Sequence, residues 1–177
     1  MLAMSFGVSL SKRPRATCAF LEKAIPRFVA GPLVVSLDRL VLYDGADPRR
    51  CLQPDVFVKI GTSGAGGEGP WKTWERGAPE VAFEVLSPVD TPEPWPLQEK
   101  LKRYRSLGVR ELFVFNIEGK PGRRLRAWDR ADWDLVEREV LGDRTVSRVL
   151  DVDLVVTERE PLAVALEVEK HEKKKKK

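Results

Sequence analysis

Short apolar runs separated by turn-forming residues predict several β-strands along the chain. Val81–Leu86 (VAFEVL) and Glu111–Asn116 (ELFVFN) are almost entirely apolar, as expected of strands that are buried on both faces. Residues 33–43 are rich in Val and Leu and predict one long strand. Residues 54–60 predict a strand that begins beside an acidic residue, and residues 149–156 predict a late strand or sheet edge.

Two segments have apolar residues at helical spacing. Residues 1–15 are expected to be irregular, and residues 17–25 predict a short helix that Pro26 limits, because proline removes a helical hydrogen bond. Leu97–Leu107 predicts an amphipathic helix that ends at Gly108. Its apolar face consists of Leu97, Leu101, Tyr104 and Leu107.

The order of these elements predicts a mixed α/β (α+β) fold. A hairpin is expected with arms at 124–128 and 133–137 around a turn at 129–132. Helix, strands, helix, strand and hairpin then follow one another, which favours a central mixed sheet flanked by helices over a doubly wound fold. The length of 177 residues suits one domain, residues 1–169, followed by a lysine-rich flexible tail at 170–177.

The basic character of the protein comes from that tail. The formal net charge is +4, but residues 170–177 contain six lysines and one glutamate and so carry a net +5. The remaining residues therefore carry a net charge of −1. Composition alone does not mark the folded part as a nucleic-acid-binding domain.

Scarce residue types exclude several classes of enzyme. The one histidine, His171, lies in the lysine tail, so catalytic sites that need a packed imidazole are not expected. Cys18 and Cys51 are too few for a zinc site and suit a reducing, cytoplasmic setting. No run approaches the roughly 20 apolar residues of a membrane span, so no membrane partner is expected. Any catalysis would rest on carboxylates, lysines, hydroxyls or a hard metal ion.

Two carboxylates stand out because of their apolar neighbours. Asp55 precedes one predicted strand, and Glu84 lies between Phe83 and Val85 inside another. A buried carboxylate is costly unless something compensates its charge, and Mg²⁺ does so with one or two carboxylates plus other oxygen ligands. If the two strands are neighbours, Asp55 and Glu84 can share one ion, with the carbonyl of Val85 as a third ligand. The alternative is that Glu84 faces solvent from an amphipathic strand.

A lysine on the following helix would complete such a site. Lys100 and Lys102 both lie on the predicted 97–107 helix, and Lys100 is four residues before Tyr104. A lysine beside a metal-bound water can orient that water or neutralise charge in a phosphoryl-transfer transition state. The alternative is an ordinary exposed helix lysine.

Several segments of the sequence together resemble a known protein family. The segments PDVFVKIG, WKTWERGAPEVAFEVLSP and EKLKRYRSLGVRELFVFN, followed by VSRVLDVDL, are similar in order and spacing to the Uma-type restriction endonuclease family of bacteria. That family is a branch of the PD-(D/E)xK nuclease superfamily. The resemblance covers about residues 40–156 and depends on the combination of P-D-V, E-V-L-S-P and E-K-L-x-x-Y.

The resemblance implies a restriction-endonuclease-like core with Asp55, Glu84 and Lys100 as catalytic residues. Asp55, Glu84 and the Val85 carbonyl would hold Mg²⁺, or alternatively Mn²⁺. The superfamily places its lysine two residues after the glutamate, where this chain has Leu86; the lysine on the following helix matches the Uma-type family.

One family position differs in this chain. Family members often have an acidic residue four positions before the helix lysine, where this chain has Pro96. Asp90 or Glu93 is a candidate substitute from a shifted position. Ser87 matches the family serine, for which we expect a supporting role.

The function implied is Mg²⁺-dependent hydrolysis of DNA phosphodiester bonds. The alternative is a catalytically inactive protein of the same fold that acts as a binding or structural module; a third hypothesis is a subunit that needs a partner. A homodimer would suit cleavage of two strands. The candidate DNA-binding residues form short basic clusters at Lys12–Arg13–Arg15, Arg49–Arg50, Arg103–Arg105 and Arg123–Arg124–Arg126, together with the tail.

Overall fold

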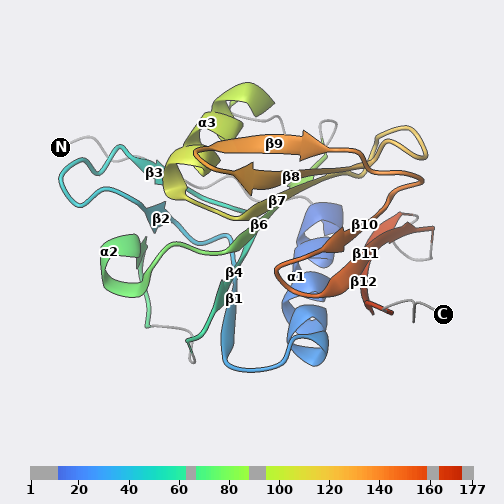
Figure 1. Cartoon of the computed structure of the whole chain (residues 1–177), viewed down its shortest axis with the longest axis horizontal. Coiled ribbons are helices and arrows are strands. Elements are labelled where there is room, and N and C mark those ends of the chain that lie inside the picture. Colours follow the sequence, from blue (N-terminus) through green and yellow to red (C-terminus); the bar gives the residue numbers. More distant parts are fainter. Residues whose placement is uncertain (1–11, 63–66, 88–94, 159–163, 173–177) are drawn as a thin grey trace.

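The computed structural model describes the chain except residues 1–11, 63–66, 88–94, 159–163 and 173–177. Its centre is a six-stranded sheet in the order β1-β4-β6-β7-β8-β9 (Figure 1). β6 and β7 are parallel and every other neighbouring pair is antiparallel, so the sheet is mixed. Its strands are β1 (Leu33–Leu37), β4 (Val56–Ile60), β6 (Val81–Leu86), β7 (Glu111–Asn116), β8 (Leu125–Ala131) and β9 (Asp134–Arg138).

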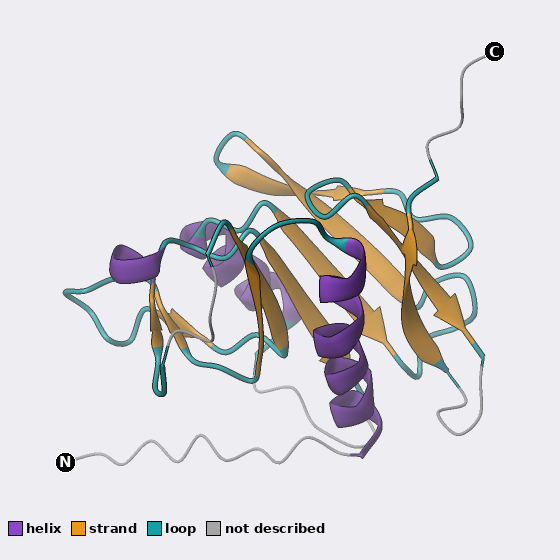
Figure 2. Ribbon diagram, turned by 90° about the horizontal axis from the view of Figure 1, so that it is seen from below, coloured by secondary structure: helices purple, strands orange, loops and turns teal. Residues whose placement is uncertain are grey.

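A helix covers each face of this sheet. α1 (Lys12–Phe28) contacts β1, β4 and β6 and shares one apolar cluster with Val81, Phe83 and Val85 (Figure 2). α3 (Leu97–Leu107) shares a second cluster, on the other face, with Ala82 and Leu112. Because side chains alternate along β6, its odd-numbered residues meet α1 and its even-numbered residues face α3. The predicted mixed α/β fold is therefore confirmed.

Three of the predicted elements have the bounds expected from their sequence pattern. These are β6, α3 and β7. α3 ends where expected, because Gly108 adopts the left-handed conformation with φ 93° and its N–H bonds to the Tyr104 carbonyl. The hairpin is also confirmed: β8 extends further, to Ala131, than the predicted first arm, and β9 begins one residue later than the predicted second arm.

The first helix is longer than predicted. It begins at Lys12 rather than near residue 17, and it continues past Pro26 to Phe28. A proline in the first helical turn is tolerated because the N–H it lacks would have had no partner, and Pro14 occupies such a position. Pro26 lies near the other end, where few helical bonds remain to be lost. The expectation that residues 12–15 are irregular was therefore wrong.

The long strand predicted over 33–43 is two strands. β1 ends at Leu37, and Asp38 adopts φ 46°, which turns the chain before β2 (Val41–Leu42). The Asp38 N–H bonds to the Asp55 carbonyl at 3.0 Å, which holds this corner against the start of β4. β2 joins a small separate sheet that the sequence pattern did not predict. Its other members are β3 (Cys51–Leu52) and β5 (Trp71–Lys72), and α2 (Thr73–Arg76) follows directly.

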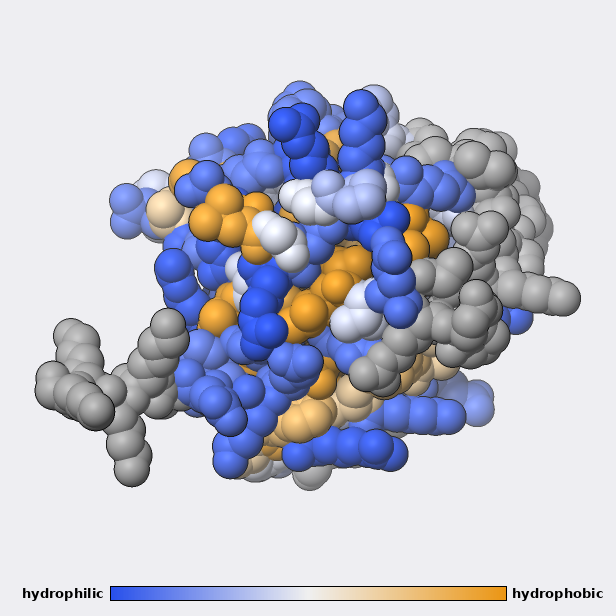
Figure 3. All heavy atoms as spheres, turned by 90° about the vertical axis from the view of Figure 1, so that its right-hand side faces the viewer, coloured by the Kyte–Doolittle hydropathy of each residue, from blue (hydrophilic) through white to orange (hydrophobic). Residues whose placement is uncertain are grey.

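A third sheet closes over α1. It contains β10 (Arg144–Ser147), β11 (Val152–Thr157) and β12 (Ala165–Lys170), and β12 contacts α1. The predicted late strand is β11, which lies in the middle of this sheet rather than at an edge. Figure 3 views the molecule from this side, where apolar atoms emerge between polar side chains.

The start of the predicted tail belongs to this sheet. Lys170 is the last residue of β12, and the Nδ1 atom of His171 lies 2.7 Å from Oδ1 of Asp153. Residues 173–177 lie outside the described part of the chain. None of the helices within the described residues is long and apolar enough to span a membrane.

Candidate active site

Asp55 immediately precedes β4, and Glu84 lies on the neighbouring strand β6, at the same end of their pairing. Val56, the first residue of β4, pairs with Phe83 of β6, so Asp55 and Glu84 follow as the next position on each side. The Oδ2 atom of Asp55 accepts a hydrogen bond from the N–H of Val85 at 2.6 Å. The predicted juxtaposition of these two acidic residues is therefore what the structure contains.

Glu84 is buried, with 3% of its surface exposed, and it faces α3 rather than solvent. Its Oε2 atom lies 2.6 Å from the ammonium of Lys100, which is itself 8% exposed. Its Oε1 atom accepts a hydrogen bond from the hydroxyl of Tyr104, which is fully buried. Charge-assisted bonds of this kind offset the desolvation of a buried carboxylate. The alternatives of a solvent-facing Glu84 and an exposed Lys100 do not hold.

The helical repeat explains how α3 supplies both donors. Lys100 and Tyr104 are four residues apart, so they lie on one face of the helix, one turn from each other. That face packs on the even-numbered side of β6, which carries Glu84 between Ala82 and Leu86. A tyrosine four residues after a lysine was the signal available in the sequence. We assigned Tyr104 to the apolar face and did not predict that its hydroxyl would bind Glu84.

The oxygen atoms gathered here fit a hard divalent cation. Within a strand, the N–H and C=O of one residue point to the same side, so the Val85 carbonyl is directed toward Asp55 as its N–H is. The described residues contain no group of three or more His, Cys, Asp and Glu side chains that could hold a metal. Two carboxylates and a carbonyl nevertheless suit Mg²⁺, which often takes one or two carboxylates and fills its other positions with water and phosphate.

α1 closes the other side of this site. Burial, and after it the charges of Asp55, Asp38 and Glu84, raise the pKa of the Cys18 thiol far above its ordinary value. Cys18 therefore stays protonated, and Cys18 and Cys51 are both buried free thiols.

Two further positions that the family resemblance singled out, Ser87 and Pro96, lie within the described residues. Ser87 is buried, and its hydroxyl donates to Oε1 of Glu118 at 2.9 Å. Pro96 is the N-cap residue of α3, and its carbonyl accepts the N–H of Lys100 at 3.2 Å. Pro96 carries no carboxylate with which to ligate a metal. Asp90 and Glu93, the candidate substitutes, lie outside the described residues.

Two of the predicted basic clusters meet in space. Arg49, Arg50, Lys102 and Arg103 line one hollow of about 300 Å³ between α3 and the segment before β3. Arg103 also lies over the Trp95 ring, 3.8 Å from its centroid. Acidic neighbours reduce the positive charge here, since Asp47 and Glu99 line the same hollow.

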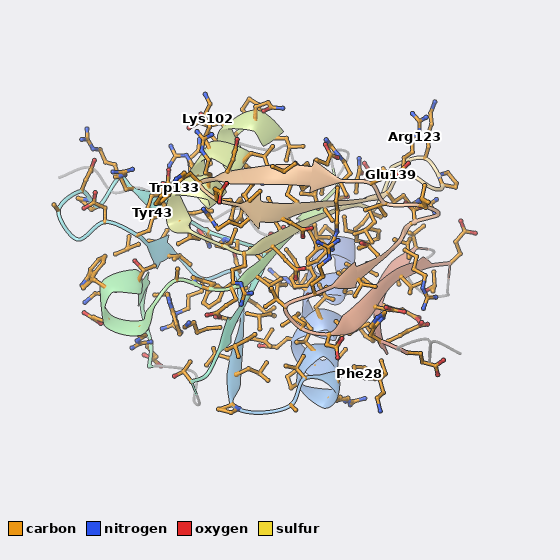
Figure 4. The ribbon with its side chains drawn as sticks, viewed as in Figure 1. Phe28, Tyr43, Lys102, Arg123, Trp133 and Glu139 are labelled. Carbon is orange, nitrogen blue, oxygen red and sulfur yellow. The ribbon has the colours of Figure 1, made fainter. Side chains whose placement is uncertain are left out.

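None of the other predicted basic residues with a described side chain lines this hollow. Arg105 pairs with Asp134, Arg124 with Glu158, and Arg126 with Glu137. Figure 4 shows Lys102 on the outer side of α3 and Arg123 at the opposite end of the molecule. Among the basic residues whose side chains the structure describes, the clusters are thus dispersed, and only Arg103 is brought together with Arg49 and Arg50.

A known protein family matches most of the chain. A family model described as "Uma2: Putative restriction endonuclease" matches residues 11–164. The chain belongs to the Uma2 family. The matched range includes both candidate carboxylates, the helix lysine and the first two strands of the third sheet. The resemblance to the Uma-type family, inferred from motifs over about residues 40–156, is therefore confirmed and extends into α1.

Structural comparison gives a weaker likeness. The chain is similar to a crystal structure of a putative nuclease belonging to DUF820 from Anabaena variabilis ATCC 29413, with 14% sequence identity and a TM-score of 0.41. The alignment covers 71% of this chain and 72% of that one. No curated protein matches the chain significantly.

Proposed function

We propose that this Uma2 family member is a Mg²⁺-dependent endonuclease that hydrolyses DNA phosphodiester bonds. The observation that supports the proposal is the convergence of Asp55, Glu84 and Lys100 from three different elements. In the PD-(D/E)xK superfamily, which the sequence resembles, two acidic residues and one lysine are the catalytic set.

The chain would supply three functions. Asp55 and Glu84, with the Val85 carbonyl, would hold the ion, and Mn²⁺ would suit the same oxygen ligands. When bound, Mg²⁺ supplies Lewis-acid chemistry that polarises the phosphoryl group and acidifies the attacking water. Lys100 would orient that water and stabilise the negative charge that develops on the phosphoryl oxygens. Its place beside Glu84 sets the ammonium at the edge of the proposed metal site.

DNA binding would draw on the hollow beside α3. Arg49, Arg50, Lys102 and Arg103 line it, and α3 also carries Lys100. The exposed ion pairs of this surface contribute little stability, so phosphate oxygens can compete with Asp47 and Glu99 for the same cations. The affinity should fall with salt, because each neutralised phosphate releases counterions.

Cleavage of supercoiled plasmid DNA in the presence of Mg²⁺ tests the proposal. Glu84→Gln and Asp55→Asn should each abolish nicking, since both keep the side-chain shape and remove the ligand charge. Glu75→Gln is the matched control, because Glu75 is exposed and pairs with Lys72 on the surface. Equal cleavage by purified Glu84→Gln and the unmodified protein would refute the assignment.

A second function is favoured by one observation. Both oxygens of Glu84 already accept bonds from this chain, from Lys100 and Tyr104, so the carboxylate is compensated without a metal. A protein that keeps the nuclease fold as a binding or structural module would have such a pair, and Pro96 at the family's acidic position agrees with it. Calorimetry with Mg²⁺ or Mn²⁺ separates the two functions: an inactive module should show no binding that depends on Asp55 and Glu84.

A further inference from the structure

The two oxygens of Glu84 have partners of different character. Tyr104, which binds Oε1, is fully buried and belongs to the apolar cluster under α3. Its carbonyl also accepts the N–H of Gly108 at the helix end. A phenol ring has few rotatable bonds, so packing on every side fixes its hydroxyl in one place.

Lys100, which binds Oε2, has a longer and more flexible side chain. It lies at the end of the first turn of α3, four residues after the Pro96 N-cap. Its ammonium is carried on a flexible four-carbon stem, and 10% of the side chain is exposed. The ammonium can therefore leave Oε2 while the Tyr104 hydroxyl stays on Oε1.

The Lys100 ammonium and a divalent cation would compete for the same oxygen of Glu84. Lys100 supplies one positive charge to Glu84 at a distance of 2.6 Å. A divalent cation shared by Asp55 and Glu84 would bring two positive charges to the same oxygen, and like charges at such distances repel strongly in a buried site. The ammonium and the cation cannot both remain at Oε2.

We infer that Tyr104 is a positioning residue that anchors Oε1 of Glu84, and that Lys100 is a built-in counterion that yields Oε2 to a divalent cation. The inference rests on the proposed function and deepens it. Lys100 then serves twice: it neutralises Glu84 in the metal-free protein, and it is released toward the substrate side when the cation binds.

Calorimetric titration with Mn²⁺ tests the inference, because the two variants should change the Mn²⁺ affinity in opposite directions. Lys100→Gln should bind Mn²⁺ about tenfold more tightly, because a competing charge is lost. Tyr104→Phe should bind it about tenfold more weakly, because a charge-assisted bond that orients the ligand is lost. Lys102→Gln removes the same charge from the exposed face of α3, and Tyr43→Phe changes the other tyrosine of the chain. Both controls should match the unmodified protein in Mn²⁺ affinity, because neither residue contacts Glu84.

Plasmid cleavage adds a readout that distinguishes the two roles. Tyr104→Phe should regain the normal rate at saturating Mn²⁺, whereas Lys100→Gln should remain inactive at every Mn²⁺ concentration. If Lys100→Gln is unfolded without metal, Mn²⁺ should refold it, since the cation replaces the lost counterion. A variant that stays unfolded in saturating Mn²⁺ would overturn the inference.

The remaining outcomes separate the inference from the proposed function. Mn²⁺ binding that depends on Asp55 and Glu84 but is equal in Lys100→Gln and Lys102→Gln would overturn the inference and leave the proposed function in place. Equal affinity in Tyr104→Phe and Tyr43→Phe would overturn the positioning role. An unmodified protein that binds no Mn²⁺ would overturn both the inference and the proposed metal site.

Discussion

Lys100 and Glu84 form a buried ion pair across the interface of α3 and β6, with 2.6 Å between Nζ and Oε2. Neither residue would be stable there alone, because an uncompensated charge in a protein interior is strongly destabilising. The pair therefore couples the docking of α3 to the integrity of the site. Replacing either Lys100 or Glu84 should therefore lower the stability of the protein as well as its activity.

Replacing Lys100 by Met should lower the free energy of unfolding by about 3–5 kcal/mol in metal-free buffer, because Glu84 is left buried without its counterion. Urea denaturation measures the change. Lys102→Met on the exposed face should alter stability by no more than about 0.5 kcal/mol. Adding Glu84→Leu to Lys100→Met should recover part of the loss, and a double variant less stable than Lys100→Met would contradict this explanation.

Cys18 should make the protein less stable in alkaline solution. Its thiol has a raised pKa in the folded protein, first because of burial and then because of nearby carboxylates, whereas in the unfolded chain it titrates near its ordinary value of 9.0. The stabilisation is complete below that value. Above it, only the unfolded state loses the proton, so stability falls by up to about 1.4 kcal/mol per pH unit.

Urea unfolding at several pH values from about 8 to about 10.5 measures this effect, because that range spans the ordinary pKa of a cysteine thiol. Cys18→Ala should be less stable overall because it leaves a cavity, but its stability should decline less steeply with pH. Parallel declines in the variant and the unmodified protein would show that Cys18 does not titrate as described.

The sequence pattern predicted the strands that are buried on both faces and the helix that has one apolar and one polar face. β6, β7 and α3 are such segments, and their bounds were predicted correctly. The break at Asp38 was not visible in the 33–43 run, because its apolar composition continues across a turn that is held by the Asp55 carbonyl. Two-residue strands such as β2 and β3 depend on long-range pairing, which no local pattern encodes.

The site was predictable only in part. Glu84 was predictable because a carboxylate is unusual between Phe83 and Val85. The family resemblance identified Lys100 among the helix lysines. The hydroxyl of Tyr104 was missed because tyrosine fits an apolar helix face equally well through its ring. Only the register of β6 against α3 reveals that this hydroxyl meets a carboxylate.

Asp143 should be a strong determinant of stability outside the site. It is 5% exposed, and its two carboxylate oxygens accept the backbone N–H groups of Gly122, Arg124 and Leu125 at 2.6–3.1 Å. Asp143→Ala should cost about 3 kcal/mol, because three N–H groups lose their acceptor, and that of Leu125 is buried. Asp143→Asn, which retains one acceptor oxygen, should cost less.

A matched variant isolates the hydrogen bonds from the backbone strain. Asp132 has φ 52°, close to the 53° of Asp143, but lies exposed in the β8–β9 turn. Asp132→Ala should therefore cost only the strain of an alanine at positive φ, about 1 kcal/mol. Thermal denaturation of both variants gives the difference, and similar losses in the two would contradict the role assigned to Asp143.

The lysine run should affect DNA affinity without affecting the fold. Removing residues 173–177 should leave the unfolding free energy unchanged and make the salt dependence of DNA binding less steep, because fewer cations contact phosphates. Removing residues from Lys170 onward should also destabilise the protein, since it shortens β12 and deletes the His171–Asp153 contact. Fluorescence anisotropy over a range of salt concentrations, with urea unfolding alongside, measures both effects; an unchanged salt slope would show that the lysines do not contact DNA.

The contact between α1 and β12 joins two elements that are separated by nearly the whole described chain. During synthesis, α1 leaves the ribosome well before β12, and this strand, which covers part of its apolar side, emerges only after the central sheet has been made. A ribosome that stalls before β12 would release a chain with that surface uncovered, and such a product is a natural target for chaperones and proteases.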